Sequence, residues 1–390
     1  MKIAYIVRQY HKTGGISLYV AELAATIPIA DEVHIFSSKI KTSGENIVKH
    51  FVPAIRFKYL EKKKKYSLYK FLEISSFMAV SKYYVDNDKY DIVHSQGDFM
   101  GKCDVYTAHS CHKAWLAVAQ RNRTGWLDAL KKSSFNPLHY CILKSEQYAV
   151  KRARKIIAIS EVVRKELTEQ YPFTADKIEV IYNGVNTDRF KPGRSEEWRK
   201  GIRDRYAIGA DDTVIIFPAH EFRRKGLTQI IEALSILKRD DIYVLVVGKD
   251  DPTRYINMSK NMCLSKNVIF AGERADIEKY YAASDLMVFP TLYEPFGLVV
   301  TEAMASGVPV IVSAIAGAAE LVKDGVNGVL LKDRNDSSEI ADKIKQLVDD
   351  REKMAEIGKN ARATVEKYSW DEISKQTYGL YERILTEKNK

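Results

Sequence analysis

Apolar and polar positions in the first half of the chain alternate between short apolar runs and longer amphipathic stretches. The apolar runs predict buried strands at residues 3–8, 32–37, 91–95, 105–108, 155–159 and 179–182. Helical spacing predicts helices at residues 17–27, 66–86, 136–153 and 161–170. We expect the rest of residues 96–135 to be irregular and to present charged and aromatic side chains. Strands that alternate with helices in this way are typical of a parallel sheet.

A polar stretch containing Pro192 and Gly193 follows Asn183-Gly184-Val185 and separates this series from a second one. In the second series, strands are predicted at 213–217, 242–247, 267–271, 285–290 and 308–312, and helices at 225–239, 274–283 and 297–306. The sequence therefore predicts two doubly wound, Rossmann-like α/β domains at 1–184 and 185–369. We expect the amphipathic segment 370–390 to form a helix that crosses back to the first domain.

The composition is that of a globular protein, since 46% of the 390 residues are hydrophobic and 29% are charged. This excludes a small single module, global disorder and a coiled coil. No apolar run reaches the roughly 18 residues that span a bilayer, and the N-terminus has no signal-peptide core. The four cysteines form no CxxC pair, which indicates reduced thiols. We therefore expect a soluble, cytoplasmic protein.

Basic side chains are concentrated in the first half of the chain. Residues 1–184 hold 29 basic and 18 acidic side chains, whereas the remaining residues hold 32 and 33. This asymmetry suggests an anionic partner such as membrane lipid, nucleic acid or a phosphorylated molecule. The basic clusters are Arg121–Arg123, Lys131-Lys132 and Lys151–Lys155, and they are interleaved with the aromatic residues Trp115, Trp126, Phe135 and Tyr140. We favour peripheral attachment to the inner face of a bacterial membrane, because no nucleic-acid recognition motif is present.

Candidate chemistry begins after the first strand, where Gly14-Gly15 precede a helix. Paired glycines let the backbone approach a ligand, and the helix N-terminus offers amides to an anion, although a turn without a ligand is the alternative. The full GxGxxG pattern is absent, and Ser37-Ser38-Lys39 supplies no acid for a cofactor ribose. A dinucleotide oxidoreductase is therefore disfavoured.

The second series carries two stronger candidates. Arg223, Arg224 and Lys225 stand at a strand-to-helix turn before a glycine, which is suited to gripping a diphosphate, although an exposed basic turn is the alternative. Further along, Glu294 and Glu302 are eight positions apart and fall broadly on one side of a helix that opens near Gly297. We expect Glu294 to accept hydroxyls of a sugar and Glu302 those of a ribose. The amides of Phe296, Gly297 and Leu298 would face phosphate or sugar oxygens.

With these motifs, the chain resembles the retaining, nucleotide-sugar-dependent glycosyltransferases of family 4, which have the GT-B architecture of two facing Rossmann-like domains. The resemblance spans nearly the full length and rests on Gly14-Gly15, His109, Ser160-Glu161, Asn183-Gly184, Arg224-Lys225-Gly226 and the pair Glu294 and Glu302. Local similarities such as Gly101–Tyr106 point toward the lipopolysaccharide core glucosyltransferases. One departure is His220, which stands where many members of the family have an arginine.

The resemblance implies a role for each matching residue. Gly14 and Gly15 would lie beside the donor phosphates, Arg224 and Lys225 would neutralise them, and Gly272 and Arg274 would frame the base. His109, Glu294 and Lys225 are the expected catalytic residues: His109 near the reacting sugar, Glu294 holding the donor sugar without acting as a nucleophile, and Lys225 stabilising the leaving phosphate. The first domain would bind a glycan or glycolipid acceptor. Because cations and amides can stabilise the leaving diphosphate, we expect neither a metal nor another cofactor.

Alternative functions remain open at the level of the sequence. A sugar-nucleotide epimerase or a phosphorylase would use the same architecture, and an assay without acceptor distinguishes them. A nucleic-acid-binding protein would exploit the basic first half, and a catalytically silent scaffold would retain the nucleotide site. The leading expectation is a hexosyltransferase that uses a UDP-linked donor and a cell-envelope acceptor.

Overall fold

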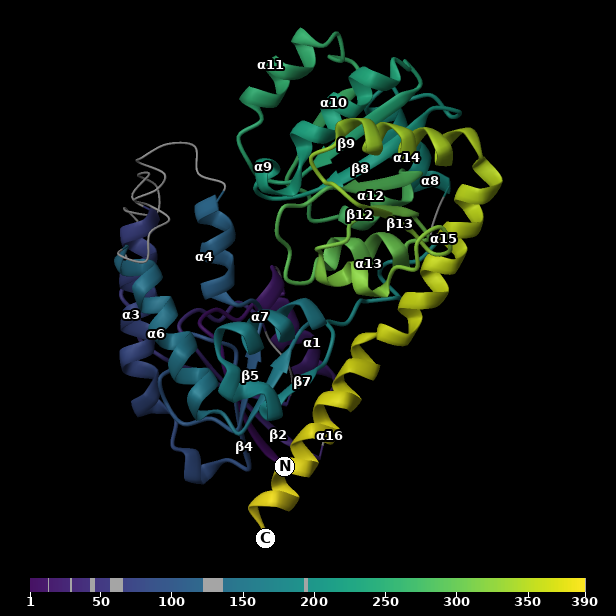
Figure 1. The fold of residues 1–390 in the computed structure, drawn as a ribbon. Coiled ribbons are helices and arrows are strands. Elements are labelled where there is room, and N and C mark those ends of the chain that lie inside the picture. Colours follow the sequence, from purple (N-terminus) through teal and green to yellow (C-terminus); the bar gives the residue numbers. More distant parts are fainter. Residues whose placement is uncertain are drawn as a thin grey trace. The chain divides into compact units, whose positions relative to one another are not determined.

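The computed structural model describes residues 1–12, 14–28, 30–42, 46–56, 66–121, 136–192 and 196–389, with the side chains of 66–68 left out. Contacts divide the chain into two compact units (Figure 1). The first contains Met1–Gly184 together with Trp370–Lys390, and the second contains Val185–Ser369. The basic and aromatic positions predicted between residues 122 and 135 lie outside the described residues, as does Gly193.

The first unit is built on a parallel sheet with the strand order β3-β2-β1-β4-β5-β6-β7. Its strands are β1 Lys2–Ile6, β2 Glu32–Ser37, β3 Ile47–Phe51, β4 Ile92–Ser95, β5 Val105–Ala108, β6 Lys155–Ala158 and β7 Ile178–Val180. The strand order reverses direction between β1 and β4, which are central and almost entirely buried. In a doubly wound sheet this reversal is the place where ligands bind, beyond the carboxyl ends of the strands.

The helices of the first unit are α1 Gly15–Thr26, α3 Tyr66–Tyr84, α4 His112–Arg121, α6 Pro137–Arg152, α7 Glu161–Gln170 and α16 Trp370–Lys388. Helix α16 packs against α1 (Figure 1), and the Tyr381 hydroxyl lies 3.0 Å from the Tyr5 hydroxyl and 2.6 Å from Nδ1 of His94. The last helix therefore belongs to the core of the first unit. Helix α4 corrects the expectation that residues 96–135 are irregular outside the strand.

The second unit has a parallel sheet with the strand order β10-β9-β8-β11-β12-β13. Its strands are β8 Thr213–Pro218, β9 Ile242–Val247, β10 Val268–Gly272, β11 Leu286–Phe289, β12 Val310–Ser313 and β13 Val329–Leu331. Strands β8 and β11 are adjacent, although about 70 residues separate them in the chain. The loops that follow these two strands therefore emerge side by side. The two sheets confirm the predicted fold class of two doubly wound, parallel-sheet domains.

Helices of the second unit are α8 Glu196–Arg205, α9 Phe222–Lys225, α10 Leu227–Leu237, α11 Thr253–Asn261, α12 Ile277–Ala282, α13 Leu298–Ala305, α14 Ser337–Asp349 and α15 Arg351–Val365. The predicted helix at 225–239 corresponds to α10, which begins after Gly226, a residue with φ +93° that separates it from α9. A Cβ atom there would lie 2.3 Å from the Pro290 carbonyl oxygen. In the part of the chain that the structure describes, no helix combines the length and apolarity that crossing a membrane requires.

Candidate donor-sugar site

The cationic turn lies directly after β8, where the sequence predicted it. Arg223, Arg224 and Lys225 form most of the single turn α9, and α10 begins after Gly226 without a side-chain cap at its N-terminus. The backbone amide of Phe222 donates to a carboxylate oxygen of Asp250 at 2.7 Å, which fixes the start of the turn. Arg223 is exposed, whereas Lys225 is buried. The three consecutive cations therefore occupy different environments.

Lys225 points to the loop that follows β11, where its Nζ contacts Oε2 of Glu294. The two side chains are 11% and 13% exposed. Burial and the neighbouring Arg224 hold the pKa of Lys225 well below its usual range, although the charge of Glu221 opposes this shift. The residues predicted to grip phosphate and to hold sugar thus belong to one compact charge cluster.

Arg224 completes this cluster from the outer side. Its Nη1 lies 3.9 Å from Oε2 of Glu294 and also donates to the Tyr293 carbonyl, while its Nε donates to Glu221 at 2.8 Å. The Arg224 carbonyl in turn accepts the amide of Leu292 at 2.8 Å. Backbone and side chain together therefore join the turn after β8 to the loop after β11.

The loop containing Glu294 is held by backbone hydrogen bonds to the segment Gly317–Leu321. Gly317 donates its amide to the Glu294 carbonyl at 3.0 Å, and Ala318 donates to the Phe296 carbonyl at 2.7 Å. Gly297 has φ +104°, and a Cβ atom there would lie 3.1 Å from Cγ of Glu294, so glycine suits this position. Phe296 is buried, and Leu298 opens α13 directly after the glycine.

Glu302 occupies a different environment on the same helix. Its Oε2 accepts a hydrogen bond from the Tyr281 hydroxyl at 3.0 Å. Burial raises the pKa of Glu302 to about 7, although the Tyr281 hydrogen bond and the Arg189 charge oppose the shift. Glu294 contacts Lys225 whereas Glu302 contacts Tyr281, and no contact between the described residues joins the two carboxylates directly.

The remaining predicted residues of the second unit contact residues other than Arg224, Lys225 and Glu294. Gly272 ends β10 with φ +75° and accepts the Gly248 amide at 2.9 Å. The exposed Arg274 guanidinium lies 5.9 Å from the centre of the Tyr280 ring. His220 is exposed, and its Nδ1 accepts the Lys249 amide at 3.0 Å.

In the first unit, the structure places His109 against the helix that begins at Gly15. Gly14 has φ +81°, and both glycines are exposed. The His109 ring meets the Tyr19 ring edge-on at 5.0 Å, and its Nε2 lies 2.8 Å from the side-chain oxygen of Gln96. Burial lowers the pKa of His109 to about 3, so the imidazole is neutral near pH 7 and can donate a hydrogen bond.

Comparison with known proteins decides the family. The profile described as Glycosyl transferases group 1 matches residues 199–364, and that of Glycosyltransferase Family 4 matches residues 13–189. The uncharacterized glycosyltransferase MJ1607 of Methanocaldococcus jannaschii is 30% identical over 301 residues, which cover 75% of each chain. The chain belongs to this glycosyltransferase family. The resemblance inferred from the motifs is thereby confirmed.

Other relatives and solved structures give the same fold. A D-inositol 3-phosphate glycosyltransferase of Corynebacterium aurimucosum is 26% identical over 308 residues, with 75% of this chain and 71% of the relative covered. WaaG, a glycosyltransferase involved in lipopolysaccharide biosynthesis, superimposes with a TM-score of 0.77 at 18% identity, covering 97% and 99% of the two chains. Anabaena HepE, solved with UDP and glucose, superimposes with a TM-score of 0.72 at 22% identity, covering 98% and 100%. The glycosyltransferase therefore has the GT-B fold.

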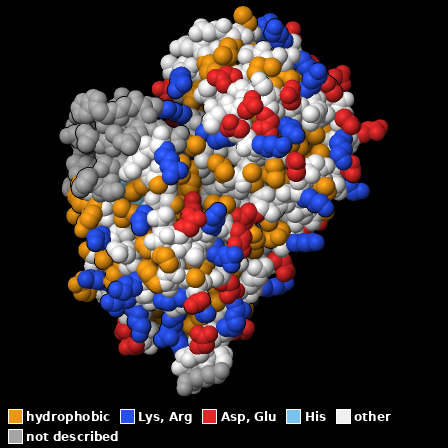
Figure 2. Space-filling view, in the orientation of Figure 1, with side chains coloured by type: hydrophobic (Ala, Val, Ile, Leu, Met, Phe, Trp, Pro, Cys, Tyr) orange, Lys and Arg blue, Asp and Glu red, His pale blue; other side chains and the backbone are white. Residues whose placement is uncertain are grey.

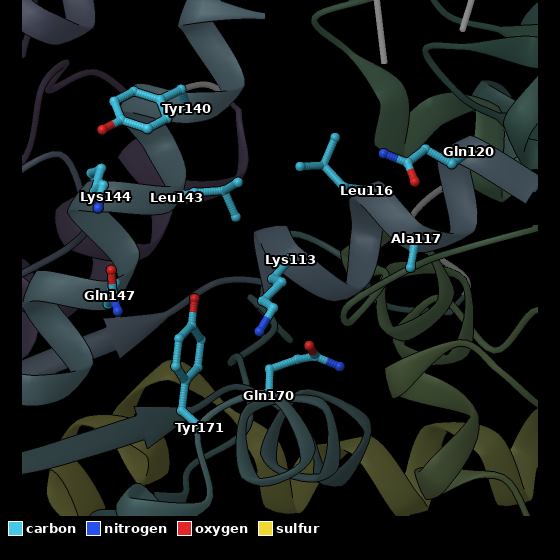
Figure 3. Close-up of a pocket in the computed structure, with 10 residues that line it drawn as sticks. All are labelled: Lys113, Leu116, Ala117, Gln120, Tyr140, Leu143, Lys144, Gln147, Gln170 and Tyr171. Atoms are coloured by element: carbon cyan, nitrogen blue, oxygen red, sulfur yellow. The ribbon is translucent and has the colours of Figure 1, made fainter. Parts of the chain in front are cut away.

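The first unit of the glycosyltransferase also contains a pocket of about 400 Å³ that no sequence motif indicated (Figure 3). Lys113 extends from α4 toward Gln170 and Tyr171, and its Nζ lies 5.5 Å from the centre of the Tyr171 ring. Lys144 stands on the facing side of α6. The remaining lining residues are Leu116, Ala117, Gln120, Tyr140, Leu143 and Gln147. None of the ten lining residues is acidic.

Buried Glu146, which no sequence pattern indicated, holds the start of α4 next to this pocket. Its carboxylate accepts the amides of His112 and Lys113 and the Tyr171 hydroxyl, the last at 2.8 Å. Burial raises the pKa of Glu146. Among the described residues of the glycosyltransferase, no group of three or more His, Cys, Asp or Glu side chains is placed to hold a metal ion.

Proposed function

We propose that the glycosyltransferase moves a hexose from a UDP-linked donor to a glycolipid or cell-envelope glycan, with retention of the anomeric configuration. The single observation that carries the proposal is the contact of buried Lys225 with Glu294, beside Arg224 and the start of α10. A buried cation next to a carboxylate is suited to a substrate with both phosphate charge and sugar hydroxyls. HepE was solved in complex with UDP and glucose, which supports the choice of donor.

Donor binding would exchange partners within this cluster. The ammonium group of Lys225 turns from Glu294 to a phosphate oxygen, and the released carboxylate accepts hydroxyls of the donor sugar. Arg224 adds a second cation on the outer side of the cluster. The amides at Gly297 and Leu298, at the start of α13, face the same ligand. Glu302 accepts the ribose hydroxyls, and Gly272 and Arg274 border the base.

The chemistry itself follows from charge development during transfer. The bond between the anomeric carbon and the diphosphate oxygen breaks while the acceptor oxygen bonds to the same carbon from the same face. The acceptor proton passes to the departing phosphate, so no nucleophile from the enzyme is needed. Lys225 and Arg224 stabilise the developing diphosphate charge, which is the contribution a metal supplies in other transferases. Neutral His109, whose Nε2 donates to the side-chain oxygen of Gln96, accepts a hydrogen bond from a hydroxyl of the reacting sugar through Nδ1.

The acceptor would bind to the first unit and carry negative charge. The excess of basic side chains in residues 1–184 supports this, as does the pocket lined by Lys113 and Lys144. Several curated relatives are named for D-inositol 3-phosphate, a phosphorylated polyol. On the face drawn in Figure 2, basic and acidic side chains are intermixed, and no continuous basic surface is visible. Attachment to an anionic membrane would therefore depend on a local cluster of side chains, namely Lys113, Lys144 and Tyr140, of which Tyr140 is 57% exposed.

Donor choice is tested by thermal shift with a panel of UDP-, GDP- and ADP-sugars. The donor that stabilises the protein most is then assayed for turnover with lipid-linked acceptors, and the anomeric configuration of the product is read by NMR. We expect a UDP-hexose and a retained configuration. An inverted product would refute the retaining mechanism, and conversion of the donor to an isomer without any acceptor would replace transfer by epimerisation.

Membrane attachment is tested separately by cosedimentation with vesicles. We expect binding that increases with the fraction of anionic lipid and decreases with salt, and that weakens when Lys113 and Lys144 are both replaced by glutamine. Binding that is indifferent to lipid charge would refute this part of the proposal without affecting the donor site.

A further inference from the structure

Helix α3 places a fully buried carboxylate, Glu73, where strand β1 ends. Its two oxygens meet four donors from separate parts of the first unit. Oε2 lies 3.0 Å from Nη1 of Arg8 and 3.5 Å from Nζ of Lys70. Oε1 lies 3.0 Å from Nε2 of Gln9 and 3.3 Å from Nε of Arg56. One carboxylate therefore holds three cationic side chains.

Positive charge exceeds negative charge around Glu73. The second carboxylate to reach the group is Asp98, which accepts from Nε of Arg8 at 2.9 Å. Among the described residues, Glu73 is the one carboxylate that Arg56 contacts. Arg8 and Lys70 contact the same carboxylate. Burial and the charge of Arg8 lower the pKa of Lys70, even though Glu73 acts against this shift. Three cationic side chains therefore share two carboxylates, which leaves one positive charge in excess.

The outer ends of the three cations reach solvent. The side chains of Arg8, Arg56 and Lys70 are 21%, 28% and 20% exposed, whereas Glu73 is completely enclosed. A carboxylate inside and cationic groups outside is the arrangement expected when the carboxylate orients the cations toward a ligand. A network that served stability alone gains little from such an excess of charge, because burying charge is costly.

The location of the group agrees with a role in binding. Arg8 and Gln9 follow β1 after Val7, and Asp98 lies in the loop after β4. These neighbouring strands flank the reversal of strand order, beyond whose carboxyl ends ligands bind. The Gln9 carbonyl also accepts the Ser17 hydroxyl of α1 at 2.6 Å, so the cluster adjoins the loop that leads to Gly14 and Gly15.

We propose that Arg8, Arg56 and Lys70, held in place by Glu73, form a subsite for a phosphate group of the acceptor. Guanidinium groups match the geometry of phosphate oxygens, and a doubly charged phosphate relieves the excess positive charge. The assignment of this phosphate to an acceptor rests on the proposed transferase function. The presence of an anion site in the first unit does not.

The test measures binding of inorganic phosphate to the full-length protein by calorimetry, in low salt and with saturating UDP present. UDP occupies the donor site, so that the measured phosphate binding occurs elsewhere. We expect a dissociation constant of about 1 mM, typical of a small ion held by a few charged groups. Arg56→Gln should weaken binding at least tenfold, and Arg56→Lys should recover part of the loss.

Lys82→Gln is the matched control, because Lys82 is an exposed cation on the same helix α3, 4.7 Å from the Tyr83 ring. It should leave phosphate binding unchanged, and all three variants should keep the UDP affinity of the wild type. The proposal is overturned if the wild type does not bind phosphate in the presence of UDP, or if Arg56→Gln and Lys82→Gln behave alike. Failure of UDP to bind at all would instead refute the donor assignment, and the phosphate titration of the same variants would still decide the subsite.

Discussion

Replacing Lys225 by alanine tests the charge cluster through both stability and catalysis. In the variant, the 13% exposed carboxylate of Glu294 loses the ammonium group that contacts it. An uncompensated buried charge of this kind costs about 3 kcal/mol, and Arg224, 3.9 Å away, can reduce the cost by moving closer. For a unit of this size, we expect the melting temperature to fall by roughly 6–12 °C.

The effect on turnover has a different origin. Lys225 is the cation expected to meet the leaving diphosphate, and loss of one preorganised group at a developing charge lowers the rate by about 10²- to 10³-fold. This corresponds to about 2.7–4 kcal/mol of transition-state stabilisation. The assay measures kcat with saturating donor, at a temperature well below the melting point of the variant, so that unfolding does not contribute.

A double variant separates the two effects. Lys225→Met combined with Glu294→Gln replaces the ion pair by neutral side chains of similar size, which should restore most of the lost stability but none of the turnover. Lys345→Ala, an exposed position on α14, is the control and should change stability by less than about 0.5 kcal/mol. A kcat for Lys225→Ala close to that of the wild type would refute the assignment of the phosphate site.

Further predictions concern three other sites, Glu302, Gly226 and Tyr381. Because burial raises the pKa of Glu302 to about 7, this carboxyl becomes a charged acceptor for ribose hydroxyls as the pH rises through that value. The affinity for UDP should therefore increase as the pH rises from one unit below this pKa to one unit above it, and Glu302→Gln should abolish the increase. The same raised pKa favours folding at low pH, and this contribution to stability should be lost as the pH rises through 7. Gly226→Ala should destabilise the second unit by more than about 2 kcal/mol in chemical denaturation, whereas Gly201→Ala, with open space around its Cβ, should not. Tyr381→Phe leaves two buried hydrogen-bonding groups short of a partner and should cost about 1–3 kcal/mol, measured by thermal unfolding.

Buried strands and strongly amphipathic helices were predictable because their signals are local. The segments 32–37, 105–108 and 161–170 were predicted with the bounds that the structure has. A strand buried on both faces appears as a continuous apolar run, which few other structures produce. The edge strand β3 was missed because its side chains are largely exposed and therefore show no such run. Helix α4 was missed because Leu116 is its one fully buried residue.

The break at Gly226 illustrates a different limit. The helix predicted from residue 225 begins instead after Gly226, whose backbone approaches Pro290, more than 60 residues away in the chain. Long-range approach of this kind leaves no local pattern. The contacts of Glu73 were not predictable for the same reason. Its partners Arg8 and Arg56 come from segments that precede α3 in the chain, and they reach Glu73 only in the folded first unit.

The contact between Lys225 and Glu294 shows how topology adds to motif reading. The sequence assigned these residues to two motifs with separate roles, one for phosphate and one for sugar. Because β8 pairs with β11, the loops after the two strands must meet, and the ion pair follows from that adjacency. The contact sets the amine of Lys225 against the Glu294 carboxylate, because a lone buried charge would be costly. A diphosphate sugar satisfies the same two groups separately, so a ligand that carries only phosphate or only hydroxyls should bind far more weakly than one that carries both.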